Sequence, residues 1–238
     1  MLPHQTKPTS RSRRLSVHLG REQAASQRLS DVAYVSVLQG LFDRRIPIGA
    51  FMTQSALVRL LGIPVQPLRD ALRVLETEGV LTIHPRSGIE FLRADAELAR
   101  STYQFRTILE QVAVRRFAAH GEAAIVEQLR REHLDLAGRI EKDDLSGHRR
   151  TLQDLDIQLH AALTSALRNP LIETTVRRLD NYVNIVQLDR RITGPMALQT
   201  IREHLAILDA CRDRHMDRAE EAVIAHLEAA LARVLEMI

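Results

Sequence analysis

Apolar positions recur every three or four residues along most of the chain, which is the spacing of amphipathic helices. Beyond Ala94 this pattern is interrupted near residue 121 and at 143–147, 168–170, 193–195 and 214–217. The interruptions predict six helices, at approximately 95–120, 122–142, 148–167, 170–191, 196–213 and 217–237. Asn169 before Pro170 marks a helix start, and Asp217 with Glu220 matches a capping box. The C-terminal part is therefore expected to be an all-α six-helix bundle.

Residues 29–93 contain a different order of elements. Helical spacing from Asp31 ends at "RRIPIGAF", and Thr53 is placed to cap a short helix over 54–61. A second helix, with Pro67 in its first turn, ends near Gly79. The β-like runs "VLTI" and "IEFL" flank "HPRSG", which predicts a hairpin. Helix, helix, tight turn, helix and hairpin is the order of a winged helix-turn-helix, so the fold class is mainly α, with this module preceding the helical bundle.

Charge is distributed unevenly along the chain. Residues 1–93 contain 13 Lys and Arg against 7 Asp and Glu, whereas residues 94–238 contain 20 against 23. Residues 1–28 hold six of the basic side chains among Ser, Thr, Gln and Pro, which predicts a flexible basic N-terminal arm. A basic N-terminal part followed by a mildly acidic one indicates a polyanion-binding module joined to a second domain. The arm itself is either a DNA contact or a solvated tail.

Composition excludes several other classes of protein. A content of 45% hydrophobic and 26% charged residues is typical of a folded chain. No run approaches the roughly 18 apolar residues of a membrane span, and the N-terminus lacks the apolar core of a secretory signal. A single cysteine, Cys211, excludes an intramolecular disulfide framework. We therefore expect a cytoplasmic protein without a membrane partner.

The segment "LVRLLGIPVQPLRDALRVLETEGVLTIHPRSG" resembles the winged helix of the GntR family of bacterial transcription regulators. The family pattern L-A-x-x-L-G-V-S-R-x-P-V-R-E-A-L, followed by L-x-x-E-G-L, is matched at ten positions: Leu57, Leu60, Gly62, Pro67, Arg69, Ala71, Leu72, Leu75, Glu78 and Gly79. The resemblance implies a regulator, expected to be a repressor, that binds double-stranded operator DNA as a homodimer and associates with the nucleoid when bound.

The expected DNA contacts follow from this placement. Arg69 and Arg73, one turn apart on the recognition helix, can contact guanine edges or phosphates, and Arg86 at the hairpin tip can contact the minor groove or the backbone. The candidate DNA-binding residues are Ser55, Arg59, Gln66, Arg69, Arg73 and Arg86. Pro64-Val65 and Ser55 stand where the family usually has DNA-contacting arginines, so its operator sequence cannot be transferred to this chain. On an isolated helix, these arginines would be interpreted as solvated charges.

Polar side chains interrupt the apolar faces of three C-terminal helices. Asp156 and His160 lie one turn apart on the face that carries Leu152, Leu159 and Leu163. His204 and His226 lie on apolar faces of the last two helices, and residue 215, in the turn, is midway between them. Antiparallel helices folded at that turn would bring the two histidines face to face. One such histidine is usually a satisfied core residue, but three with an aspartate indicate a metal site, since these ligands suit Zn²⁺, Ni²⁺, Mn²⁺ or Fe²⁺.

The same residues are similar to a second family pattern. D-x3-H, then E-H-x-x-I/L-x-A, then H-L matches the ligand-binding FCD domain of the FadR subfamily, here at Asp156, His160, Glu203-His204 and His226. Six helices resemble its shorter, VanR-like branch. The resemblance implies that residues 95–238 bind a divalent metal, zinc first among the candidates, beside a pocket for a small organic acid that acts as effector.

Two further residues are candidates for effector binding. Arg106 and Glu110 match an R-x-x-x-E pattern found in many relatives, which implies that Arg106 pairs with the effector carboxylate. The alternative is an ordinary surface pair between Arg106 and Glu110. Tyr182 flanks an inward-facing stripe of Leu179, Val183 and Val186 and is the second candidate.

Three functions fit these observations. The first is a metabolite-responsive transcription factor. The second is a metal-dependent hydrolase, because three histidines and a carboxylate can activate water, although H-E-x-x-H is absent. The third is a regulator for which the metal itself is the signal. We expect the first, and no enzymatic activity.

Overall fold

The structure is a computed structural model that describes residues 27–188 and 191–236. The chain separates into two compact units between Arg93 and Ala94. Within the described residues, no helix is long and apolar enough to cross a membrane. The predicted basic arm lies outside the described residues except for Gln27 and Arg28, which are already helical.

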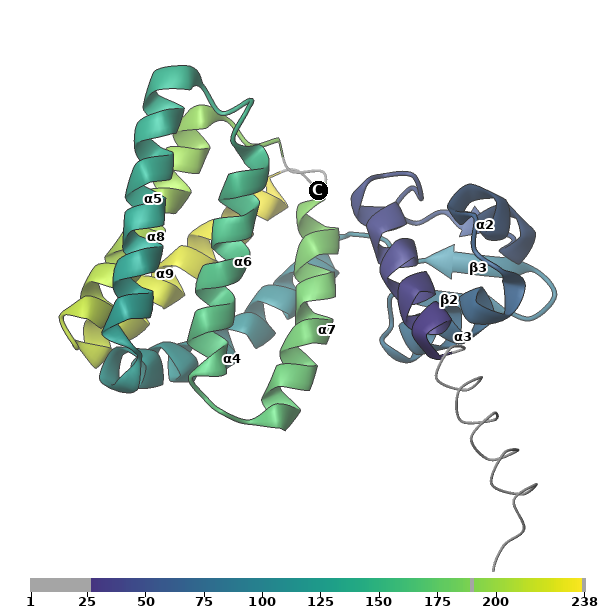
Figure 1. Ribbon diagram of the computed structural model, residues 1–238, viewed down its shortest axis with the longest axis horizontal. Coiled ribbons are helices and arrows are strands. Elements are labelled where there is room, and N and C mark those ends of the chain that lie inside the picture. Colours follow the sequence, from purple (N-terminus) through teal and green to yellow (C-terminus); the bar gives the residue numbers. More distant parts are fainter. Residues whose placement is uncertain (1–26, 189–190, 237–238) are drawn as a thin grey trace, which may run out of the picture. The chain divides into compact units, whose positions relative to one another are not determined.

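The N-terminal unit is the expected winged helix-turn-helix (Figure 1). Residues 27–42 are helical and precede β1 (Phe51–Met52), α2 (Gln54–Leu61), α3 (Val65–Thr77), β2 (Leu81–His84) and β3 (Gly88–Phe91). Thr53 caps α2 by accepting a hydrogen bond from the backbone N–H of Ala56, and Gly62 ends that helix with a φ of 67°. An L side chain is strained at such a φ, so glycine suits this turn into the recognition helix α3.

The sheet contains a strand that the hydrophobic pattern did not predict. β1 pairs with β3, which pairs with β2, and both pairings are antiparallel. The "RRIPIGAF" stretch predicts only a helix end, but Phe51 and Met52 lie opposite Glu90 and Ile89. Two residues are too few for alternation to be recognised in a sequence. Beneath the sheet, the unit's core contains Ala33, Val37, Leu41, Ile46, Leu57, Leu68, Leu72, Leu75, Val80, Ile89 and Phe91.

The C-terminal unit consists of six helices, as the pattern predicts. They are α4 (Ala96–His120), α5 (Ala123–Asp143), α6 (Arg149–Ser165), α7 (Pro170–Gln187), α8 (Gly194–Arg212) and α9 (Met216–Leu235). The C-terminal end of the helix predicted over 170–191 falls partly on residues 189–190, outside the described part. The most extensive pairing joins α4 to α9, and α8 packs on both α5 and α9. Figure 1 shows α5, α6 and α7 roughly side by side, with α4 and α9 crossing the bundle.

Side-chain caps define several of these helix starts. Asp95 caps α4, Asn169 caps α7 ahead of Pro170, and Thr193 caps α8 two residues earlier than predicted. The capping box expected at Asp217 is wrong, because His215 caps α9 and Asp217 lies inside its first turn. Asp217 and Glu220 instead accept hydrogen bonds of 2.6 and 2.5 Å from Arg115 on α4. These acidic side chains therefore help to hold the start of α9 against α4.

Candidate metal centre and its surroundings

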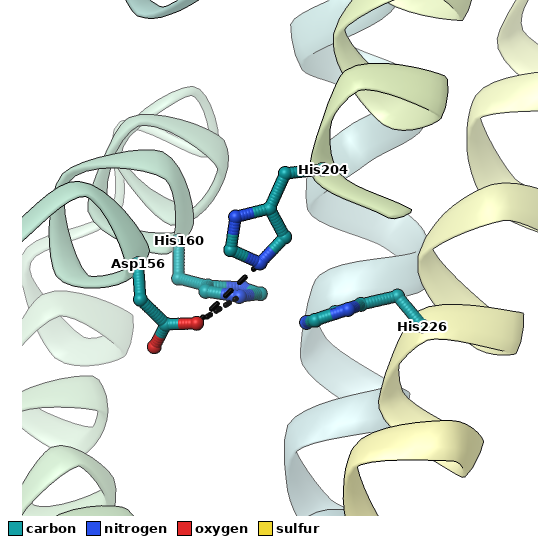
Figure 2. Close-up of side chains that lie close together, drawn as sticks. All are labelled: Asp156, His160, His204 and His226. Atoms are coloured by element: carbon teal, nitrogen blue, oxygen red, sulfur yellow. Dashed lines mark ion pairs between the residues drawn. The ribbon is translucent and has the colours of Figure 1, made fainter. Parts of the chain in front are cut away.

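Four side chains from three helices meet in the interior of the helical unit. Asp156 and His160 come from α6, His204 from α8 and His226 from α9, and each offers a ligand atom within 4.8 Å of the others. Figure 2 shows all four directed toward a common point. The three histidines are buried, and Asp156 is 25% exposed. The site therefore has one carboxylate edge open toward water.

The carboxylate and the three imidazole rings lie close enough to face one another. Asp156 Oδ1 lies 3.4 Å from His204 Nε2 and 3.8 Å from His160 Nε2. The ring centroids of His204 and His226 are 4.6 Å apart, and those of His160 and His226 are 5.3 Å apart. Antiparallel pairing of α8 and α9 around the turn at residue 215 gives this arrangement.

Each histidine is held through its other ring nitrogen. His160 Nδ1–H donates to Glu110 Oε2 at 2.5 Å, and His226 Nδ1–H donates to Glu203 Oε2 at 2.9 Å, with these donors assigned from their carboxylate acceptors. His204 Nδ1 lies 3.0 Å from Nε2 of a further buried histidine, His133 on α5. All three Nε2 atoms are thereby left for the centre of the group, and a hydrogen-bonded second nitrogen is typical of metal-binding histidines.

The electrostatic setting favours the neutral imidazoles of His204 and His226 and the charged carboxylate of Asp156. Burial lowers the pKa of His226 to about 3, and it also lowers the pKa of His204. Burial alone would raise the pKa of Asp156, but the neighbouring His204, together with His160 and Arg106, holds that pKa well below its usual range. Neutral imidazole and ionised carboxylate are the states that bind a metal ion.

The residues fit a divalent ion. Within the described residues, the Nε2 atoms of His160 and His204 are buried without a hydrogen-bond partner, which is costly unless another group satisfies them. Metal–ligand bonds of about 2.1 Å place tetrahedral ligands about 3.4 Å apart. The separation between Asp156 and His204 has this value, and the wider ones require the side chains to close on the ion.

Arg106 and Glu110 extend the site along α4. They are 5% and 3% exposed, and Arg106 Nε donates to Glu110 Oε1 at 2.5 Å. The alternative of a surface pair is therefore wrong, because both side chains are inside the bundle. Burial alone would raise the pKa of Glu110, but Arg106 and His160 hold it at about 2. Glu110 thus connects Arg106 to a candidate metal ligand.

A small pocket adjoins this network. It is lined by Arg106, Leu109, Glu110, His160, Thr164, Val176, Leu179 and Asp180, from α4, α6 and α7. Its wall combines a guanidinium, a candidate metal ligand and the carboxylates of Glu110 and Asp180 with four apolar or methyl-bearing side chains. Tyr182, the second effector candidate, is half-buried on α7 and is not among the residues that line this pocket.

The hydrophobic pattern did not predict that Glu203 and His133 hydrogen-bond the candidate metal ligands. Glu203 accepts hydrogen bonds of 2.8 Å from both Nη1 and Nη2 of Arg233, and these bonds fix the carboxylate that binds His226. In the sequence, Glu203 stands out only as part of the FCD pattern, and His133 belongs to no motif. A signal for His133 was present, since it lies on the buried stripe of Val126, Leu129, Leu136 and Ile140.

The candidate DNA-binding side chains are exposed on the N-terminal unit. Ser55 and Arg59 lie on α2, Gln66, Arg69 and Arg73 lie on α3, and Arg86 lies in the hairpin between β2 and β3. Gln66 hydrogen-bonds Asp70 at 3.0 Å, whereas the four arginines make no side-chain hydrogen bond or ion pair to another described residue. Their guanidinium groups are therefore available to phosphates and bases.

Comparison with known proteins identifies both units. Residues 101–229 match the FCD domain, and residues 29–91 match the bacterial regulatory proteins of the gntR family. The chain is 28% identical to the Nta operon transcriptional regulator of Aminobacter aminovorans, over 80% of this chain and 87% of that one. It is 24% identical to the HTH-type transcriptional regulator YdhC of Bacillus subtilis, over 81% of this chain and 85% of that one.

Two solved structures have the same fold. E. coli McbR/YncC aligns with a TM-score of 0.72 at 16% identity, covering 87% of this chain and 97% of that one. A GntR regulator from Rhodococcus sp. RHA1 aligns with a TM-score of 0.69 at 21% identity, covering 90% and 99%. These two structures support the fold, whereas the two sequence relatives are transcriptional regulators and the N-terminal family model is that of regulatory proteins. The chain belongs to the GntR family of bacterial transcriptional regulators, and its C-terminal unit is an FCD domain.

Proposed function

We propose that this regulator is a repressor whose operator binding is controlled by a small carboxylate, bound beside a divalent metal in the FCD domain. The observation that carries the proposal is the convergence of three imidazole Nε2 atoms and one carboxylate, two of the Nε2 atoms being buried without partners. A metal ion would satisfy them, and zinc is the first candidate for this ligand set.

The pocket supports a carboxylate as the effector. When bound, the metal would supply a Lewis-acidic position that attracts an anionic oxygen. Arg106 uses only Nε in its hydrogen bond to Glu110, so its two terminal nitrogens can form a bidentate pair with a carboxylate. Leu109, Val176 and Leu179 would contact the apolar body of the same molecule.

A two-fold operator requires two recognition helices, because one winged helix binds only a half-site. In the proposed homodimer, Arg69 and Arg73 contact bases or phosphates of the major groove, and Arg86 contacts the adjacent backbone or minor groove. The effector would change operator affinity only if it binds the DNA-competent and DNA-incompetent arrangements unequally.

The outward face of α4 is our candidate for the dimer interface. Phe105, Ile108 and Val112 are 41%, 53% and 55% exposed at successive turns of that helix. The same face has Glu97 near its N-terminal end and Arg116 near its C-terminal end. Two copies packed antiparallel would place Phe105 opposite Val112, Ile108 near the two-fold axis, and each acidic end beside a basic end. The stripe therefore offers apolar contact along its length and opposite charges at its two ends.

Ile108→Glu tests this interface, with Ile157→Glu as the matched control. Ile157 is 48% exposed on α6, so the two changes are chemically alike and similarly placed at the surface. We expect Ile108→Glu to raise the dimer dissociation constant by about 100-fold, because two unpaired carboxylates would face each other in the interface. Ile157→Glu should leave it unchanged. A monomeric wild type in sedimentation, free and on DNA, would exclude the dimer.

Three measurements test the regulatory proposal. Elemental analysis of protein purified without chelators, followed by zinc titration, should find one metal per chain. Fluorescence anisotropy should then detect binding to DNA upstream of the gene, and a panel of lactate, citrate and benzoate should include a compound that changes this affinity only with metal bound. Absence of metal in both the purification and the titration contradicts the four-residue site. A response to metal that no carboxylate modifies supports the alternative of metal sensing.

A further inference from the structure

His133 on α5 lies in contact with the candidate metal ligands without belonging to the four-residue group. Its ring is fully buried, its Nε2 lies 3.0 Å from His204 Nδ1, and its Nδ1 lies 2.7 Å from the carbonyl oxygen of Leu129. The rings of His133 and His204 meet edge to face, with centroids 5.1 Å apart. The two imidazoles therefore form a hydrogen-bonded chain between α5 and α8.

The direction of donation along these hydrogen bonds is fixed by the backbone carbonyl of Leu129. A backbone carbonyl oxygen can only accept, so His133 Nδ1 must carry the proton that is donated to Leu129. In neutral His133 the proton-free Nε2 then accepts, and His204 Nδ1 must be the donor. His204 Nε2 is thereby left with its lone pair, and it lies 3.4 Å from Asp156 Oδ1.

The three histidines of the site are consequently held in two different ways. His160 and His226 donate to the carboxylates of Glu110 and Glu203, whereas His204 donates to a neutral imidazole. A carboxylate orients its histidine and increases its basicity, but His133 adds no charge to the interior. It also ties the site to α5, a helix that supplies none of the four ligands.

We propose that His133 is a positioning residue of the metal centre, which fixes the ring and the tautomer of His204 so that Nε2 is directed at the ion. The inference rests on the metal site of the proposed function, but the tautomer of His204 is a property of the metal-free protein. His133 acts through His204 and does not itself bind the metal.

Two substitutions of His133 separate positioning from simple packing. His133→Leu keeps an apolar side chain in the buried position and leaves His204 Nδ1 without an acceptor. His133→Gln provides an amide oxygen that can take the place of the imidazole Nε2. Thr200→Val is the matched control, because Thr200 is a buried polar residue of α8 whose hydroxyl donates to Met196 within the same helix.

Zinc affinity, measured by competition with a chromophoric chelator, is the first readout. We expect His133→Leu to weaken binding by about 10–100-fold, the usual effect of losing the hydrogen-bonding partner of a metal ligand. His133→Gln should recover most of this loss, and Thr200→Val should bind as the wild type does. Equal affinity of the wild type and His133→Leu overturns the proposal, and so does equal weakening by the leucine and glutamine variants.

Nitrogen NMR of the histidine side chains in metal-free protein is the second readout. His204 should be protonated at Nδ1 in the wild type and in His133→Gln, and a mixture of tautomers in His133→Leu. A wild-type His204 protonated at Nε2 overturns the proposal even if His133→Leu fails to fold. If the wild type binds no zinc but His204 has the Nδ1–H tautomer, the metal site is wrong whereas the hydrogen-bonded chain between the two histidines stands.

Discussion

Replacing Glu110 by Gln would remove the carboxylate that Arg106 and His160 share inside the FCD domain. Glu110 is 3% exposed, and each of its oxygens lies 2.5 Å from one of these partners. The variant leaves the guanidinium of Arg106 buried beside a neutral amide. Breaking a buried ion pair on one side costs about 3–5 kcal/mol. Because a loss of 1 kcal/mol lowers the melting temperature of a domain this size by about 2–4 °C, we expect a decrease of at least about 6 °C.

The same substitution should weaken metal binding. His160 would lose the charged acceptor of its Nδ1–H, and such losses reduce metal affinity by about 10–100-fold. Thermal unfolding of the metal-free protein isolates the effect on stability, and chelator competition measures the effect on zinc. Glu141→Gln, at an exposed position of α5, is the control for the change of charge and should behave as the wild type.

A double variant tests the physical reason for the instability. Arg106→Met together with Glu110→Gln removes the unpaired cation, so most of the lost stability should return while zinc binding stays weak. If Glu110→Gln melts and binds zinc like the wild type, then the geometry around Glu110 has been misinterpreted. If the double variant is less stable than the single one, the instability does not come from the buried charge.

Three more results are expected. His204→Ala should lower the metal content and the melting temperature of the FCD domain and reduce its response to carboxylates, while the winged helix stays folded. An unchanged metal content would show that His204 is not a ligand. Chelator treatment of metal-loaded wild type should lower its melting temperature in calorimetry, since an ion that binds only the folded state stabilises it; an unchanged transition would contradict this linkage. Arg69→Ala should weaken operator binding by about 1–3 kcal/mol at constant salt, whereas the control Arg177→Ala on α7 should bind as the wild type does. Unchanged operator affinity of Arg69→Ala would contradict the placement of α3 in the groove.

Residue spacing was sufficient to predict the helices and the convergence of the candidate ligands. Asp156 and His160 are one turn apart, so helical geometry places them on one face of α6. His204 and His226 are equidistant from the turn that joins their helices, so antiparallel pairing places them at one level. Elements determined by contacts distant in sequence were not predictable in this way. β1 exists because two residues pair with β3, and Asp217 lies in α9 while contacting Arg115 on α4.

His133 shows where the local pattern ceases to be informative. Its place on the apolar stripe of α5 predicts burial, but its partner depends on how α5 packs on α8, 71 residues further along the chain. The same reason applies to Arg106 and Glu110, whose i, i+4 spacing fits an exposed pair as well as a buried one. The packing of α4 against α6 decides between these alternatives, because it brings Glu110 to His160.

Helix α4 carries several parts of the proposed mechanism. It begins at Ala96, shortly after the last strand of the winged helix ends at Phe91. Its inward side places Arg106 and Glu110 at the pocket and the candidate metal site, and its outward side exposes the stripe of Phe105, Ile108 and Val112. An effector bound by the two terminal nitrogens of Arg106 would share that guanidinium with Glu110, and Glu110 also holds His160. A shift of α4 would therefore change the metal site, the proposed dimer interface and the start of the connection to the DNA-binding unit together. The effector would then bind the two positions of α4 with different affinities, as control of operator binding requires.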